Sequence, residues 1–143
     1  MSQRSKIVNA LVSKLKLING KAPYTSNVYG KNVTNKLIFW DEVKDFPYLC
    51  VVAGSETREY LPGDFKWGYL NIAIKLYVHG ETANDLLENL ISDVERIVSE
   101  NENLPITNTT TTEILINSIV TDEGLLNPYG VGEVNLTVRY QVL

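Results

Sequence analysis

The sequence has very few of the residues that most often carry chemistry. It contains one cysteine, Cys50, and one histidine, His79, among its 143 residues. A single cysteine excludes an intrachain disulfide and a zinc site built from several cysteines. Within the apolar run "FPYLCVVAG" it is typical of a small buried side chain. The two residues could act as nucleophile and base only if the fold brought them together. The sequence therefore predicts no enzyme, no cofactor and no metal site.

Long apolar runs, phosphate-binding glycine motifs and an excess of basic charge are also missing. No segment approaches the roughly 18 apolar residues of a membrane span. Lysines interrupt the N-terminal apolar residues that a signal peptide would keep continuous. The formal net charge is −4, from 13 basic and 17 acidic residues, so no long-range attraction draws the protein to nucleic acid or an anionic membrane. We expect a soluble protein made in the cytoplasm, past which DNA slides rather than binds.

Two stretches carry apolar residues at helical spacing. Residues 5–18 place one every three or four positions, and Gly20 ends the pattern. A second and longer stripe runs over residues 83–98, after Thr82, which we predict as the N-cap of that helix. Each stripe needs an apolar surface to cover it, so we expect both helices to pack on a sheet.

Alternating apolar and polar residues predict the strands. The alternation is clearest in residues 69–78, where five apolar side chains point to one face. The other predicted strands are residues 48–53, 113–120 and 132–142, and the threonine-rich residues 107–112 open the third of these. The sequence therefore predicts an α+β fold. Its mostly antiparallel sheet has about four to five strands, with two amphipathic helices packed on one face.

One domain is expected over residues 1–143, because this length suits a single core. Residues 19–36 are polar, contain Pro23 and Gly30, and are predicted as an extended arm or loop. Tyrosine and tryptophan residues gather in or beside the loops, a composition that is typical of protein–protein contacts. They are Tyr24, Tyr29, Trp40, Tyr60, Trp67 and Tyr129.

Several motifs together resemble one protein family. A strand entered through "FP" is followed by "FKWGYLNIAIKLYV", by a helix that carries "DVE", and by a "TDEG" loop with a proline before the last strand. This succession, over roughly residues 45–142 together with the N-terminal helix, resembles the tail terminator (tail-completion, head–tail joining) proteins of tailed bacteriophages. Residues 19–36 have no counterpart in the resemblance.

The resemblance implies a virion structural protein at the head–tail junction. Such proteins form rings, usually hexameric, that cap the head-proximal end of the tail tube, stop its polymerisation and join the tail to the head connector. The implied partners are further copies of the chain, the tail-tube protein and the connector or stopper protein. DNA passes through the ring without sequence-specific binding.

Three groups of residues are the candidate contacts within that role. The outward positions of the central strand are predicted to meet a neighbouring subunit or the tube; they are Tyr69, Asn71, Lys75 and Tyr77. The mixed-charge stretch 54–67 is a second candidate, with Arg58, Tyr60 and Trp67. The loop before the last strand is predicted to face the lumen or a neighbour through Asp122, Glu123, Asn127 and Tyr129. Its turn is ascribed to Gly124 and Gly130, with Pro128 stiffening it.

Two alternatives remain open at this level. One is another head–tail connector or stopper subunit, or a protein related to the tail tube; ring size and binding partner separate these. The other is a small ligand-binding domain, which would need polar groups converging in a pocket between the sheet and the helices.

Overall fold

The computed structural model describes all 143 residues. The elements, in chain order, are α1 (Gln3–Leu15), β1 (Val33–Thr34), the 3-10 helix η1 (Trp40–Glu42), β2 (Tyr48–Leu61), β3 (Phe65–His79), α2 (Ala83–Glu100), β4 (Pro105–Ile106), β5 (Thr109–Thr121) and β6 (Tyr129–Gln141). Neither helix is long and apolar enough to cross a membrane.

The strands form one six-stranded sheet in the order β1-β2-β3-β6-β5-β4. β1 runs parallel to β2, and every other neighbouring pair is antiparallel. The predicted α+β class is confirmed, but the prediction of four to five antiparallel strands is wrong, because the sheet has six strands and is mixed. The two additional strands, β1 and β4, are two residues long, which is too short to produce an alternating pattern in the sequence.

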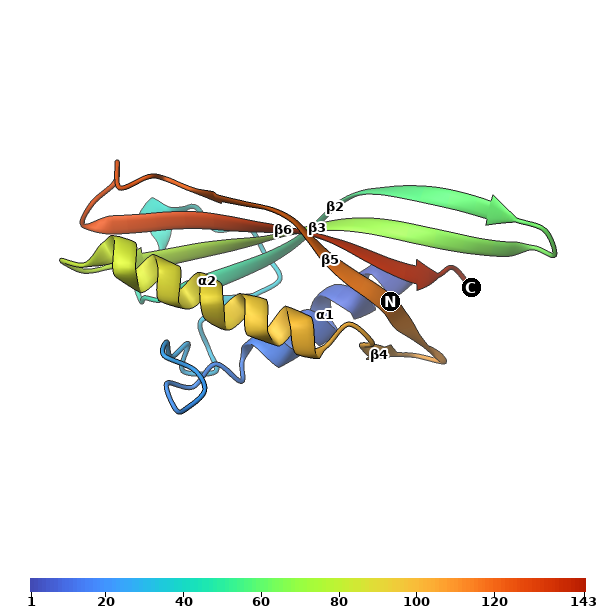
Figure 1. The fold of residues 1–143 in the computed structure, drawn as a ribbon, viewed down its shortest axis with the longest axis horizontal. Helices are drawn as coiled ribbons and strands as arrows, with labels where there is room; N and C mark the ends of the chain where they lie inside the picture. Colours follow the sequence, from blue (N-terminus) through green and yellow to red (C-terminus); the bar gives the residue numbers. More distant parts are fainter.

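Both helices lie on the same side of the strongly twisted sheet (Figure 1). α1 packs against β2, and α2 packs against the central strands β3 and β6. Between them lies a cluster of 27 buried residues, almost all aliphatic. Each buried leucine, isoleucine or valine stabilises the fold by about 1.5–3 kcal/mol relative to an exposed position. The apolar stripes predicted for the two helices form the helical side of this core.

The helix ends differ from the predicted ones in three respects. α1 ends at Leu15, three residues before the predicted end at residue 18. α1 begins at Gln3, because the side chain of Ser2 accepts a hydrogen bond from the Ser5 backbone N–H and caps the first turn (3.1 Å). Thr82 occupies the N-cap position of α2, but its side chain makes no capping hydrogen bond. The prediction of a Thr82 cap is wrong in that sense, and α2 depends on the burial of its apolar face.

β2 is much longer than the predicted strand 48–53. It continues to Leu61 and forms a hairpin with β3 whose tip extends beyond both helices (Figure 1). All of residues 54–61 except Glu56 are exposed, and most of them are polar, so the alternation that marks a half-buried strand is missing. A shift of register between Ala53 and Glu56 marks the point where the uncovered part begins.

The segment between α1 and β1 packs on α2. Asn19 and Asn27 form an isolated antiparallel bridge, and Val28 is fully buried. Asp93 of α2, 4% exposed, accepts hydrogen bonds from the backbone N–H groups of Ser26 (2.8 Å) and Thr25 (3.3 Å). The carboxylate thereby satisfies donors of a segment that has little secondary structure of its own.

Candidate assembly interface

The face of the sheet opposite the helices carries a network of uncharged polar side chains. Asn71 on β3 donates to the Ser55 hydroxyl on β2 (3.0 Å), and Thr137 on β6 donates to Asn71 Oδ1 (3.1 Å). Asn117 on β5 donates to Thr137, so the network reaches across four strands. Side chains that are hydrogen-bonded to one another in this way form a rigid polar surface.

Charges on this open face are paired. Lys75 forms an ion pair with Glu133, and Tyr69 donates its hydroxyl proton to Glu59 (2.9 Å). That hydrogen bond is the main reason why the pKa of Tyr69 is raised. Three of the predicted contact positions, Tyr69, Asn71 and Lys75, therefore lie together on one surface of little net charge.

Tyr77 does not join that surface, although it shares their face of β3. Its side chain is 4% exposed, and its hydroxyl donates to the Ile38 carbonyl (2.7 Å). The segment around Ile38 thus lies against Tyr77, and burial raises the pKa of Tyr77 to about 12. The strand pattern indicated the correct face, but the chain itself covers this position, so the ring cannot be a contact unless that segment moves.

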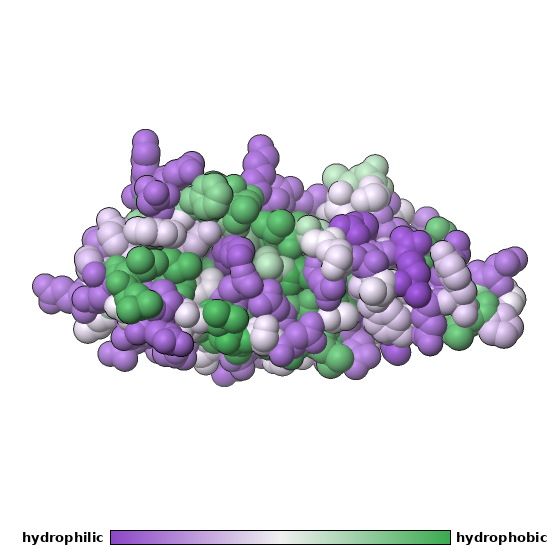
Figure 2. Space-filling model, turned by 90° about the horizontal axis from the view of Figure 1, so that it is seen from above, coloured by the Kyte–Doolittle hydropathy of each residue, from purple (hydrophilic) through white to green (hydrophobic).

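A shallow hollow of about 500 Å³ lies on the open face, lined by Leu37, Val52, Ala73 and neighbouring polar residues. Figure 2 shows this face, with apolar side chains over its middle and over the end where β6 begins, whereas the hairpin end is mostly hydrophilic. The ligand-binding alternative needed polar groups converging between the sheet and the helices. That space is filled by the apolar core.

The β2–β3 hairpin presents aromatic and basic side chains near its tip. Tyr60 is 71% exposed, and Lys66 lies 5.8 Å from the centre of its ring. Phe65 packs edge-on against Trp67 at 4.9 Å, and Arg139 of β6 stacks over Trp67 at 4.4 Å. Exposed aromatic rings supported by cations are typical of protein contacts.

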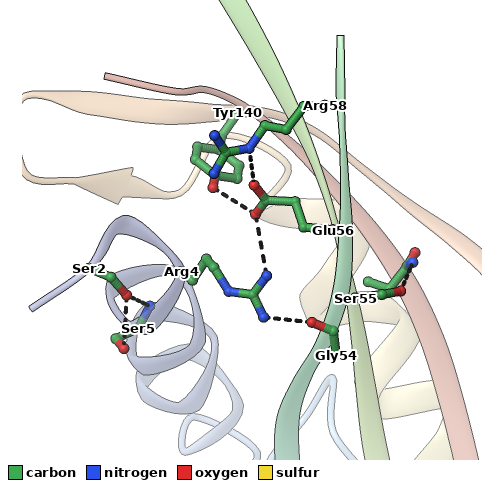
Figure 3. A network of polar contacts seen from close by, with 9 residues as sticks. Ser2, Arg4, Ser5, Gly54, Ser55, Glu56, Arg58 and Tyr140 are labelled. Carbon is green, nitrogen blue, oxygen red and sulfur yellow. Dashed lines mark hydrogen bonds and ion pairs between the residues drawn. The ribbon is translucent and has the colours of Figure 1, made fainter.

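Glu56 fixes the base of the hairpin (Figure 3). Its carboxylate, 5% exposed, accepts a hydrogen bond from Tyr140 (2.7 Å) and pairs with Arg58, while Arg4 of α1 lies 3.8 Å away. Arg4 also donates to the Gly54 carbonyl. Burial, followed by this contact with Glu56, raises the pKa of Tyr140 to about 12. Arg58, a predicted contact residue, is therefore also part of the hairpin's internal support.

The loop between β5 and β6 is closed by one of its own predicted contact residues. Asp122 accepts hydrogen bonds from the backbone N–H groups of Leu126 (3.0 Å) and Val131 (3.2 Å). Its carboxylate thus points into the loop, while Glu123 and Asn127 are exposed. Leu125 at the tip is 86% exposed and is a contact candidate that sequence reasoning missed.

The two glycines of this loop are required for different structural reasons. Gly124 adopts a positive φ of 84° and makes the turn, as predicted. Gly130 does not have a positive φ, so the prediction that it turns the chain is wrong. A Cβ there would lie 2.7 Å from Val78 Cγ2, so the absence of a side chain lets β6 approach β3 and α2.

An aromatic cluster joins the start of β6 to two distant segments. Tyr129 packs on His79 at 4.5 Å, on Trp40 at 5.2 Å and on Phe46 at 5.9 Å between ring centres. Sequence reasoning missed this cluster, and the placement of all four rings beside loops was its only signal. His79 therefore packs among aromatic rings, whereas Cys50 is buried and faces the Ile38 carbonyl, 3.9 Å from Sγ.

Comparisons with known proteins give consistent results. The family model described as "Bacteriophage Tail Tube Terminator Protein" matches residues 1–143. A curated relative, the tail tube terminator protein p142 of Escherichia phage T5, is 38% identical over 154 residues, covering 99% of this chain and 95% of the relative. A solved chain from the virion of a native gene transfer agent particle has the same fold. It has a TM-score of 0.64 at 8% identity, and the match covers 99% of this chain and 96% of that one.

Proposed function

We propose a function from one premise: the chain belongs to the bacteriophage tail tube terminator family. It is a structural protein of the virion tail, and its role is to end the tail tube. The observation that carries this function is the 38% identity to a curated terminator over nearly the whole length of both proteins. The family has a structural role, so the protein is proposed to act by binding and not by catalysis.

We propose that several copies form a closed ring on the head-proximal end of the tube, and that this ring also binds the head connector. The shape of the subunit supports this, because the molecule is elongated along its strands and its two ends differ (Figure 1). One end is the hairpin tip with Tyr60, and the other carries the β5–β6 loop with Leu125. A ring of such subunits, standing on end, would present one contact to the tube and a different contact to the connector.

We propose that the open face of the sheet lines the channel through which DNA passes. Unpaired basic residues would hold the phosphate backbone by releasing its counterions. On this face Lys75 pairs with Glu133, and Arg139 lies 3.9 Å from Glu113. Amides and hydroxyls occupy the middle of the face, so DNA would meet a polar surface with little net charge.

We propose that residues 1–143 make up one domain, since one buried cluster takes side chains from both helices and from β1, β2, β3, β5 and β6. No part of the chain described here has a second cluster of that kind.

Light scattering and electron microscopy with the tail-tube protein of the same phage test the function. The purified protein should bind one end of growing tubes as a ring and stop their elongation. Normal tube growth in a molar excess of the protein would refute the proposal.

Single substitutions then separate the two ends. Tyr60→Ser at the hairpin tip and Leu125→Ser at the loop are matched, because both side chains are highly exposed and neither supports the core. One variant should lose tube capping, and the other should cap tubes but fail to bind connectors. Equal loss of both activities in either variant would contradict the assignment of one end to each partner.

A further inference from the structure

Charge is divided unevenly along the chain. Residues 1–36 contain seven lysine and arginine residues and no aspartate or glutamate, whereas residues 81–123 contain ten acidic residues and one arginine. The net charge of −4 conceals this separation.

The fold places the two charged segments toward different edges of the sheet, on the one face that both helices cover. The basic segment provides α1, which packs mainly against β2 and also touches β4, and β1, which pairs with β2. The acidic segment provides α2 and β5. Glu95 and Glu100 of α2 line a shallow hollow together with Arg96 and with Ile116 of β5, so the second half of the helix borders β5. We call these regions the basic flank (residues 1–36, with α1 and β1, beside β2) and the acidic flank (α2 and β5).

Both flanks border a strand edge that is mostly unpaired. β1 pairs only with Leu49 and Cys50, which leaves residues 51–61 of β2 without a neighbouring strand on that side, although Arg4 donates to the Gly54 carbonyl. β4 pairs only with Thr109 and Thr110, and Asn103 and Leu104 hydrogen-bond to the next two residues, which leaves residues 113–121 of β5 without a neighbouring strand. Free edges of this length are templates for another strand, and monomeric proteins usually protect them.

The β5 edge is apolar where a protected edge would be charged. Leu115 is 48% exposed, Ile119 41% and Val120 55%. Lysine and proline, the residues that normally block such an edge, do not occur in β5. This edge therefore has the properties of an interface with another strand.

The two edges are in register with each other across the sheet, and their strand directions suit antiparallel pairing. Ala53 of β2 lies in one row with Ile72, Leu136 and Ile116 of β5, and both edge strands have their register shift next to this row. The four long strands alternate in direction, so β2 and β5 run opposite to each other. A rotation about an axis parallel to the strands keeps the strand directions of each copy. Copies related in this way would join β5 of one copy to β2 of the next as an antiparallel pair, with the register shifts of the two strands side by side.

Charge then decides between the two symmetries that such edges allow. A two-fold dimer would pair β5 with β5, or β2 with β2, and would bring like-charged flanks together. Joining β5 of one copy to β2 of the next brings the acidic flank against the basic one. This head-to-tail contact leaves a free edge at each end, which is the condition for a ring.

We propose that the edge of β5, with its acidic flank, binds the edge of β2, with its basic flank, on the next copy of this chain. The proposal rests on the proposed ring and identifies its subunit contact. Because the contact joins opposite charges near the surface, ring assembly should weaken as ionic strength rises.

Two charge-reversal variants test the contact. Glu88→Lys with Glu95→Lys makes the acidic flank basic, and Lys16→Glu with Lys36→Glu makes the basic flank acidic; all four side chains are exposed. Either variant alone should assemble more than about tenfold less tightly than wild type, because like charges then face each other at every contact. An equimolar mixture of the two variants should recover assembly, since every contact between unlike variants joins opposite charges. The chain that carries all four substitutions should also assemble.

A matched control carries Glu42→Lys and Glu81→Lys, which change the net charge equally but lie outside both edges. It should assemble as wild type does, and circular dichroism should show all variants folded. Assembly is measured by light scattering on the protein alone and by electron microscopy at tube ends.

The outcomes keep this contact distinct from the function. Separate reversal variants that assemble like wild type, or a mixture that does not recover, would overturn the proposed contact. Tubes that stop growing under a bound monomer would also overturn it, while leaving the terminating function intact. Rings that form as described but fail to stop tubes would leave the contact intact and remove the function.

Discussion

Replacing Asp93 with alanine should detach the segment between α1 and β1 from α2. The carboxylate is 4% exposed, and its acceptors hold the N–H groups of Thr25 and Ser26. Alanine keeps the helix and removes both acceptors. Val28, which is fully buried, would then lose the contacts that hold its segment in place.

The size of the effect can be worked out from the contacts. Hydrogen bonds to a charged group contribute about 1.5–3 kcal/mol each. The 2.8 Å bond to Ser26 should be worth a value in that range, and the bonds to Thr25, at 3.3–3.4 Å, should be worth less. We expect Asp93→Ala to reduce the free energy of unfolding by about 2–4 kcal/mol. Asp93→Asn retains one acceptor oxygen and should lose about half as much.

Urea denaturation of the monomeric protein measures the loss, and hydrogen exchange locates it. Exchange should accelerate first at Thr25 and Ser26, before the core strands are affected. Ser92→Ala is the control, because Ser92 is the exposed neighbour of Asp93 in the same helix. A free energy within about 0.5 kcal/mol of wild type for Asp93→Ala, with unchanged exchange at Thr25, would refute this explanation of the buried carboxylate.

Three further predictions concern the sheet. Tyr77 and Tyr140 have pKa values raised to about 12 from an ordinary 10. Because the folded-state pKa is the higher one, the stability that each neutral hydroxyl contributes is complete below pH 10 and is lost as the pH rises through 12. In an ultraviolet titration Tyr77 and Tyr140 should therefore be the last of the eight tyrosines to ionise, and simultaneous ionisation of all eight in the folded protein would disprove this. Cys50 is fully buried and burial raises the pKa of its thiol, so a thiol reagent should label it only after unfolding; rapid labelling of the native protein would contradict the position of β2. Gly130→Ala should reduce stability by about 1–3 kcal/mol by overpacking against Val78, whereas a calorimetric midpoint equal to that of wild type would show that this contact relaxes freely.

Local pattern was sufficient for the elements that have one covered face. The alternation over residues 69–78 predicted β3, and the apolar stripe over residues 83–98 predicted α2, because in each case one face is buried by the same core. Where both faces are uncovered, as in residues 57–61, the same reasoning had no signal, and it ended β2 too early.

Contacts between distant segments account for most of what the sequence did not reveal. Tyr77 has the spacing of an outward position, but its side chain is buried and its hydroxyl donates to the Ile38 carbonyl. The carboxylate of Asp122 looks like a free loop charge, but it is used by the backbone of its own loop. Nothing in the spacing of Tyr129 and Trp40 indicates that their rings meet. In each case the deciding neighbour is set by the tertiary fold and not by the local sequence.

The uncovered end of the β2–β3 hairpin has a consequence for how the protein can diverge. Every side chain of residues 60–64 is exposed, so the core does not depend on the identity of these residues. Substitutions and changes of length there cost little stability, while they alter the outermost surface of the molecule. When the partner protein of a phage changes, substitutions at the hairpin tip can therefore restore a matching surface while the rest of the fold stays the same. Among related chains, we expect this tip to vary in sequence and length more than any segment that contributes to the core.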